Sequence, residues 1–115
     1  MFRRKALAIA SLCTIVCTQA GSAVADDKFK SAEFLKWSQE ERKSYIFTSV
    51  VMAGVIAGQN KPEQAKCIDQ WMADYEPAGF PSVKDAMSRF PEHHPSGVIV
   101  AVLEKACGSV KYTGK

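Results

Sequence analysis

The sequence has little of the chemistry on which enzymes and metalloproteins depend. It contains two histidines, His93 and His94, which are adjacent within the stretch FPEHHPSG, and it contains no C-x-x-C or G-x-S-x-G motif. Zinc needs three or four converging ligands, and adjacent residues of a helix do not face the same way. We therefore predict no catalytic residue, no metal site and no cofactor. We interpret the histidines as a turn between two helices, although a pH-sensitive or binding role stays open.

Long hydrophobic runs are also scarce, and the most apolar one lies at the N-terminus. The chain begins MFRRK, continues through the apolar stretch Ala6–Val16 and reaches the small-residue pattern Ala23-Val24-Ala25. This order of basic, apolar and small residues is typical of a secretory signal peptide, with cleavage after Ala25. The apolar stretch is shorter than the roughly 20 residues of a spanning helix. We therefore expect residues 1–25 to be removed, no stable membrane anchor and a periplasmic, secreted protein.

The mature chain, residues 26–115, has no net charge. The full sequence carries 15 Lys and Arg against 12 Asp and Glu, a formal charge of +3. Arg3, Arg4 and Lys5 leave with the signal peptide, so 12 basic residues balance 12 acidic ones. The apparent basicity therefore gives no indication of a nucleic-acid partner. The remaining 90 residues are enough for a single small domain.

Cysteine becomes scarce as well, because only Cys67 and Cys107 remain after cleavage. In an oxidising compartment an even number of cysteines favours a disulfide. In the chain-entropy model, closing a loop of about 40 residues stabilises a fold by roughly 3–4 kcal/mol. We predict the Cys67–Cys107 disulfide; a free, reactive or metal-bound pair is the alternative.

Helix signals follow one another along the mature chain, without repeats or low-complexity tracts. Ser38 and Glu41 fit a capping box, and proline is suited to the first position of a helix. The expected helices are a short one over 32–37 capped by Ser31, one from Ser38 to about Gly58, one over 62–76, one over 83–90 capped by Ser82, and one from about Pro95 to Ala106. The pattern predicts an all-α domain, a compact bundle of about five short helices with one disulfide.

Two of these helices have unusual sequences. The stretch YIFTSVVMAGVIAG is nearly apolar all round, which predicts a helix buried at the centre of the domain. Gly54 and Gly58 within it suggest a close approach of a neighbouring helix, or the helix end. The later stretch VIVAVL is rich in β-branched residues and typical of a strand, but no second strand-like run in the mature chain would pair with it. We expect it to be helical.

The loop from Tyr75 to Pro81 contains the aromatic residue Phe80 between Gly79 and Pro81. Phe80 either packs back onto the core or is exposed for contact with a partner. Two prolines restrict the loop, which lowers the ordering cost of binding. We take Tyr75 and Phe80 as candidate partner-binding residues.

The mature layout resembles the Rap/Tai-type immunity proteins of type VI secretion systems. The resemblance depends on four segments: FKSAEFLKW, SYIFTSVVMAGVIAG, the following Cys67, and HHPSGVIVAVLEKACG with its closing Cys107. It implies a periplasmic protein that binds a toxin effector, often a peptidoglycan amidase, and blocks its active site. It assigns no inhibitory residue to this chain. Both a one-to-one complex and a two-to-two complex with a homodimer are compatible with it.

A second resemblance is to the HdeA-type acid-stress chaperones, which are small, periplasmic and all-α. It depends on the segment SAEFL and on the single disulfide. It implies a fold that loosens at low pH and exposes apolar surface to client proteins. An HdeA-like periplasmic acid-stress chaperone is therefore the alternative function.

Overall fold

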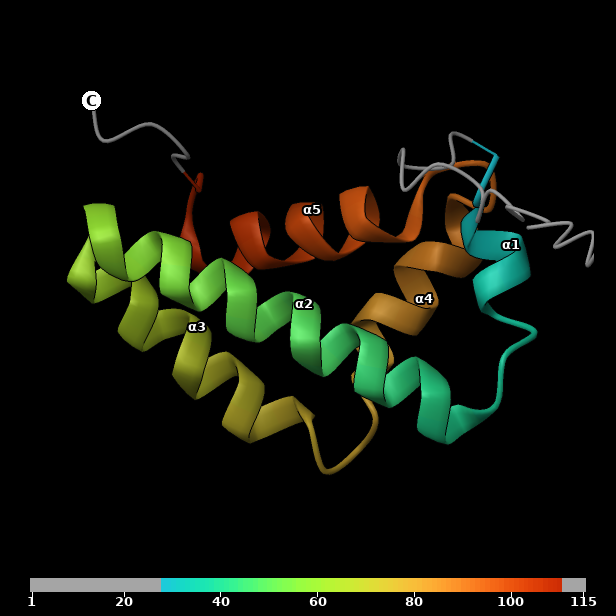
Figure 1. Ribbon diagram of the computed structural model, residues 1–115, viewed down its shortest axis with the longest axis horizontal. Helices are drawn as coiled ribbons and strands as arrows, with labels where there is room; N and C mark the ends of the chain where they lie inside the picture. Colours follow the sequence, from blue (N-terminus) through green and yellow to red (C-terminus); the bar gives the residue numbers. More distant parts are fainter. Residues whose placement is uncertain (1–27, 111–115) are drawn as a thin grey trace, which may run out of the picture.

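The structure is a computed structural model that describes residues 28–110 (Figure 1). This range contains five α-helices and no strand, so the predicted all-α class is confirmed, and the stretch VIVAVL is helical. The helices are α1 (Ser31–Phe34), α2 (Gln39–Asn60), α3 (Pro62–Tyr75), α4 (Pro81–Arg89) and α5 (Pro95–Cys107). The predicted signal peptide and its cleavage site lie outside the described residues.

Local chemistry sets the ends of the longer helices. The Ser38 hydroxyl accepts a hydrogen bond from the Glu41 amide (3.2 Å), and the Glu41 carboxylate accepts one from the Ser38 amide (3.3 Å), so the predicted capping box is confirmed. Pro62 and Pro95 begin α3 and α5, where their missing N–H groups cost no helical hydrogen bond. Gly58 does not end α2, which continues to Asn60.

The start of α4 differs from the predicted serine cap. Phe80, at the N-cap position, has a left-handed backbone (φ 56°) and follows Gly79, which is also left-handed (φ 76°). This turn directs the Phe80 side chain into the core, and α4 begins at Pro81 without a side-chain cap. Ser82 is therefore inside the helix.

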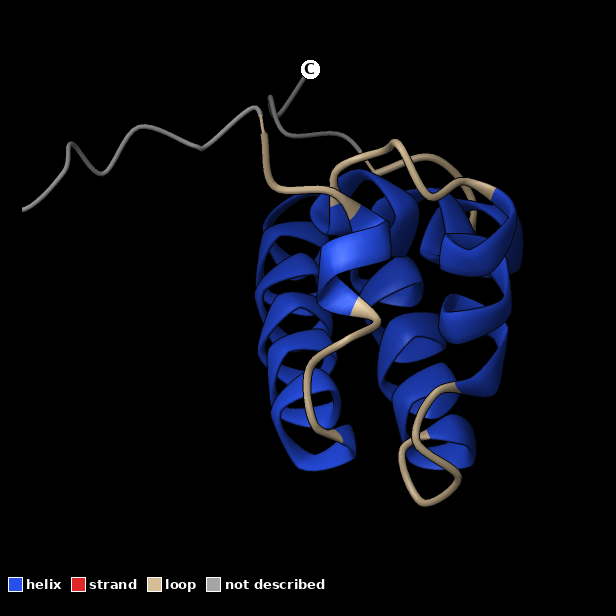
Figure 2. Cartoon of the chain, turned by 90° about the vertical axis from the view of Figure 1, so that its right-hand side faces the viewer, coloured by secondary structure: helices blue, strands red, loops and turns tan. Residues whose placement is uncertain are grey.

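The helices pack side by side in one bundle (Figure 2). Helix α2 runs along the front in Figure 1 between α3 and α5, and the two short helices α1 and α4 lie at one end. The predicted disulfide is confirmed: Cys67 of α3 is bonded to Cys107 at the end of α5. It joins the two helices that flank α2 (Figure 1).

All five helices contribute to a single apolar core. Its fully buried large side chains are Phe34, Ile46, Val50, Ile68, Phe80, Val83, Met87, Ile99 and Leu103. Every buried side-chain nitrogen or oxygen in residues 28–110 has a hydrogen-bond partner, as a close-packed interior requires. Among these residues no helix has the length and apolarity needed to cross a membrane.

Gly54 and Gly58 of α2 lie beside α3. A Cβ atom at Gly54 would lie 3.6 Å from the Ile68 side chain, and one at Gly58 would lie 3.8 Å from Ala65. α3 is therefore the helix that packs against both glycines, at distances where a Cβ atom would make ordinary contact. The prediction of central burial for α2 is wrong, however, because only one face of the helix is covered.

Candidate functional site

The two adjacent histidines have different structural tasks. His94 caps α5, because its Nδ1 accepts a hydrogen bond from the Ser96 amide (3.1 Å), and its ring packs edge-on against Phe29. The His93 side chain is exposed, while its carbonyl oxygen accepts hydrogen bonds from the Ser31 amide (2.8 Å) and hydroxyl (2.7 Å). The segment is the turn into α5, as predicted.

This turn also holds α1 in place. Ser31 is fully buried, and its hydroxyl donates a hydrogen bond to the His93 carbonyl oxygen. The prediction that Ser31 caps α1 is therefore wrong. At the surface, the Lys30 ammonium lies 2.6 Å from the Glu92 carboxylate. Their hydrogen bond, reinforced by the opposite charges, holds the pKa of Glu92 below its usual value and the pKa of Lys30 above it. Within residues 28–110, no group of three or more potential metal ligands gathers.

The Tyr75–Pro81 loop has only one of the two predicted contact residues at the surface. Phe80 is 0% exposed and its ring stacks on Trp71, with the ring centroids 5.5 Å apart. Its assignment as a partner-binding residue is therefore wrong: the left-handed turn at Gly79 and Phe80 directs the ring into the core. Tyr75 is 41% exposed and remains available for contact.

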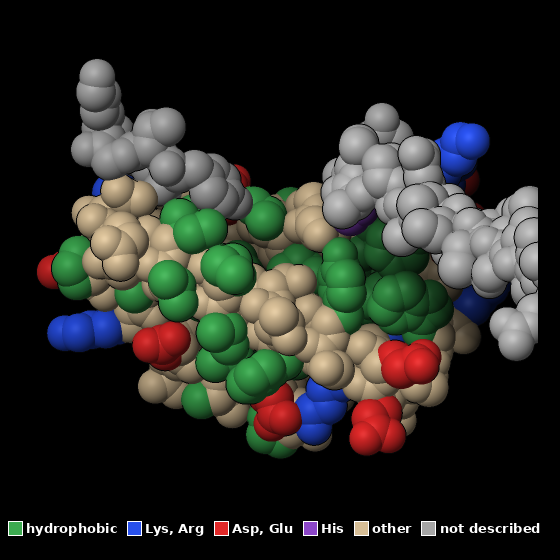
Figure 3. Space-filling model, in the orientation of Figure 1, with side chains coloured by type: hydrophobic (Ala, Val, Ile, Leu, Met, Phe, Trp, Pro, Cys, Tyr) green, Lys and Arg blue, Asp and Glu red, His purple; other side chains and the backbone are tan. Residues whose placement is uncertain are grey.

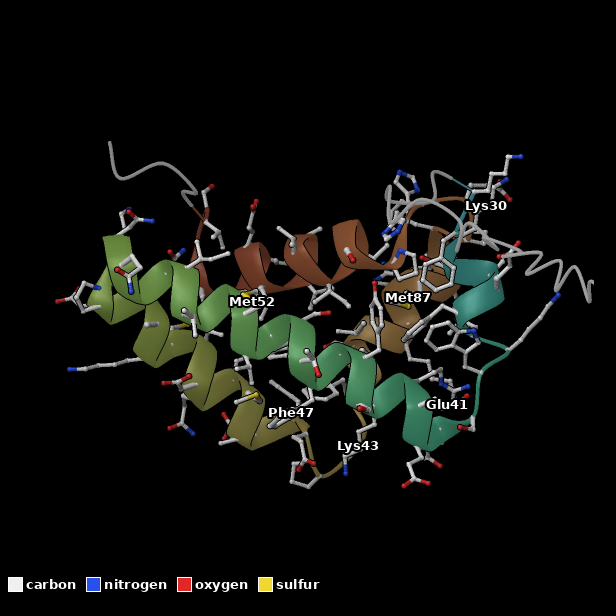
Figure 4. The ribbon with its side chains drawn as sticks, viewed as in Figure 1. Lys30, Glu41, Lys43, Phe47, Met52 and Met87 are labelled. Atoms are coloured by element: carbon white, nitrogen blue, oxygen red, sulfur yellow. A yellow bond between two sulfur atoms is a disulfide. The ribbon has the colours of Figure 1, made fainter. Side chains whose placement is uncertain are left out.

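An exposed apolar surface lies on the outer face of α2, which we define as Phe47, Val51, Met52 and Val55. These four are among the exposed large hydrophobic residues of the described chain, and Met52 and Val55 are 59% and 57% exposed. Pairs three or four residues apart, such as Met52 with Val55 and Phe47 with Val51, lie on the same side of a helix. The covered side carries Ile46, Val50, Ala53 and Ala57. Apolar side chains are spread over this surface in Figure 3, and Figure 4 labels Phe47 and Met52 on α2.

Charge is absent from this part of α2. The 17 residues from Ser44 to Asn60 include no Asp, Glu, Lys, Arg or His. Helices at protein surfaces normally carry charged side chains opposite the core. An exposed face of large apolar side chains, without charges between them, is typical of an interaction surface.

An open groove adjoins the N-terminal end of this face. It has a volume of about 930 Å³, and its lining includes Trp37, Glu40, Glu41, Ser44 and Thr48. Trp37 is 37% exposed, and its ring stacks on the ring of Phe29, with the centroids 5.3 Å apart. The Thr48 hydroxyl donates a hydrogen bond to the Ser44 carbonyl oxygen (3.0 Å). Carboxylates beside an aromatic ring suit a cationic group.

The sequence contained the signal for this surface. Ile46 and Val50 recur with the period of one helical face, and Phe47 and Val51 recur with the period of the next. Two apolar faces on one helix indicate either central burial or a second face that is open. Only the positions of the other four helices decide between them, and they cover one side.

The chain was also compared with known proteins. No family model, no curated protein and no solved structure matches it.

Proposed function

We propose that this is a periplasmic immunity-type protein that binds a secreted toxin and blocks it. The toxin class is one that degrades the cell wall, such as a peptidoglycan amidase. The observation that supports this function is the outer face of α2, with four large apolar side chains in a charge-free segment. Burial of apolar surface contributes about 25 cal/mol per Å², so a partner that covers these side chains gains affinity without chemistry at the site.

The surroundings of α2 favour tight binding. The inner face of α2 packs against the other helices, and the Cys67–Cys107 disulfide links α3 to α5. A rigid helical surface loses little conformational entropy on binding. The contact would exclude water around an apolar centre, as protein interfaces do.

The groove at Trp37, Glu40 and Glu41 makes the two ends of the proposed surface differ in charge. Its two carboxylates lie at the first turn of α2, while Lys61 follows the other end of the helix. A partner with a basic side chain at one end of its apolar patch matches this distribution. Such charge complementarity mainly selects the partner and its orientation.

The function is tested by competition between sibling strains of the native organism. A strain that lacks the gene should die beside a sibling that secretes the toxin, and the wild-type gene should restore survival. Met52→Glu places a charge on the outer face of α2 and should fail to restore survival. Ala73→Glu is the matched control, because it adds the same charge at an exposed position of α3.

Purified toxin completes this test. It should bind the wild-type protein and the Ala73→Glu variant, and bind Met52→Glu at least about tenfold more weakly, as for a contact at the centre of an interface. Survival of the deletion strain beside every toxin-secreting sibling would refute the immunity function. Equal binding of both variants would refute the assignment to α2.

The same surface distinguishes the immunity function from an acid-stress chaperone. Its apolar side chains are exposed in the folded state, so partner binding needs no opening of the fold at low pH. We therefore expect no suppression of client aggregation near about pH 2–3 beyond that of an unrelated small helical protein. Strong suppression at that pH, absent at neutral pH, would support the chaperone instead.

A further inference from the structure

A second surface, separate from the outer face of α2, lies between α4 and α5. It is a groove of about 350 Å³, at the lower end of the roughly 300–1,000 Å³ that small-molecule sites span. Ala86 and Val98 form a buried apolar floor, and Ala101 and Val102 continue it along α5. Phe90 is half exposed at its edge. The groove is therefore small and apolar, with a half-exposed aromatic ring at its edge.

The groove is open because α5 has a glycine there. Gly97 lines the groove, and a Cβ atom at this position would have no neighbour within 4 Å. No positive φ requires glycine at this position. Larger side chains would therefore occupy the groove without disturbing the core, which gives a direct way to test it.

The charged groups along the groove are all basic. Arg89 and Lys105 line it together with His93, and none of the described lining residues carries a carboxylate. The Arg89 guanidinium is already paired with Asp85 (3.0 Å), whereas Lys105 makes no ion pair within residues 28–110. The uncompensated positive charge therefore lies at the Lys105 end.

We infer that this groove binds a free medium-chain monocarboxylate, with its alkyl chain on the apolar floor and its carboxylate at Lys105. From Gly97 to Lys105 the helix rises about 12 Å, comparable to an extended alkyl chain of medium length. Few hydrogen-bonding side chains lie on the floor, so a polar ligand such as a sugar would lose its hydration there without replacement. One cationic end and an apolar remainder match one carboxylate and one chain.

Three probes that share one alkyl chain test the head group. Laurate carries the carboxylate, dodecanol is neutral and dodecyltrimethylammonium is cationic. The full chain is expressed and the purified protein is titrated below the micelle concentration of each probe, with binding followed by calorimetry and amide NMR. Laurate should bind best, and the shifted amides should be those of α4 and α5, not those of α2.

Variants test the chain and the head group separately. Gly97→Leu should fill the groove and weaken binding of laurate and dodecanol by about tenfold or more. Ala73→Leu adds the same side chain at an exposed position of α3 and should leave binding unchanged. Lys105→Met keeps the stem but removes the charge, so it should weaken laurate by about two- to fivefold, as for an exposed ion pair, and leave dodecanol unchanged. Thermal unfolding checks that each variant is folded.

Equal binding of laurate and dodecyltrimethylammonium, or laurate binding that survives Gly97→Leu, would overturn the inference. So would binding of an apolar peptide with a free C-terminal carboxylate at this groove when laurate does not bind. The outcome is independent of toxin binding, because the two surfaces share no residue.

Discussion

The two faces of α2 are both apolar, yet they have different surroundings. The inner face carries Ile46 and Val50 and then the smaller Ala53 and Ala57. Next to these alanines, α3 packs against Gly54 and Gly58. The outer face carries the larger Phe47 and Met52, which are 43% and 59% exposed. Apolar character alone therefore does not identify the core of this protein. Burial separates the two faces: the inner one packs against other helices, and the outer one keeps large side chains exposed.

The largest effect should come from placing a charge on each face in turn. Val50 and Val51 are neighbours in sequence, but Val50 is 0% exposed and Val51 is 39% exposed. Val50→Asp buries an unpaired carboxylate and should lower the free energy of unfolding by about 4 kcal/mol or more. Val51→Asp should cost about 1 kcal/mol or less. Urea unfolding measures both, and equal losses would show that the two faces are not distinct.

The disulfide should have the next largest effect, because it links the helices that hold the inner face. Replacing Cys67 and Cys107 together by serine should lower the free energy of unfolding by roughly 3–4 kcal/mol. The reduced wild-type protein should show a similar loss, which controls for the substitutions themselves. A loss below about 1 kcal/mol would mean that packing alone fixes α3 against α5.

A smaller change at the α2–α3 contact sharpens the comparison. Gly54→Leu should separate the helices and cost about 1–3 kcal/mol. Gly54→Ala should be neutral or stabilising by up to about 1 kcal/mol, because its Cβ would lie at ordinary contact distances of 3.5 and 3.6 Å. Chemical denaturation of both variants checks this. Equal stability of the leucine variant and the wild type would contradict a close helix crossing.

The smallest effect on stability should come from the Lys30–Glu92 ion pair, which lies at the start of α1 and not on α2. The folded pKa of Glu92 is lowered, so the pair stabilises above the ordinary carboxyl value of 4.5 and loses this contribution as the pH falls through the folded value. The raised pKa of Lys30 means that the contribution persists below 10.5 and is lost as the pH rises through the folded value. Both side chains are substantially exposed, so the effect is modest.

Glu92→Gln tests the pair. Its melting temperature should be slightly below that of the wild type near neutral pH, and the two should converge as the pH falls through the lowered pKa of Glu92. Ala32→Gln, at a partly buried position of α1, provides a comparison without a carboxylate. A difference for Glu92→Gln that stays constant after the Glu92 carboxylate has become protonated would contradict the contribution of the ion pair.

Much of the fold was predictable because its signals are local. The capping box at Ser38, the prolines that begin α3 and α5 and the Cys67–Cys107 pair each act within a short segment or through one covalent bond. The roles of Ser31 and Phe80 were not predictable in the same way. A serine before a helix normally caps it, but Ser31 bonds to a carbonyl 62 residues away.

The outer face of α2, which we propose as the binding surface, was only partly predictable for the same reason. The sequence shows that α2 is apolar on both sides, but which side is covered depends on how α3 and α5 pack. For Phe80, a left-handed turn directs the ring into the core. The sequence Gly79-Phe80-Pro81 alone is compatible with a buried or an exposed ring. Contacts between distant segments decide whether these side chains are buried or exposed.

The most direct test of the outer face of α2 uses the protein's own methionines. Met52 is 59% exposed on α2, while Met87 on α4 is 0% exposed (Figure 4). Oxidation converts exposed methionine to its sulfoxide, so peptide mass spectrometry should find rapid oxidation of Met52 and slow oxidation of Met87 in the free protein. With the toxin bound, Met52 should become protected while Met87 stays unchanged. Oxidation of Met52 at the same rate in the saturated complex would contradict the assignment of the outer face of α2 as the binding surface.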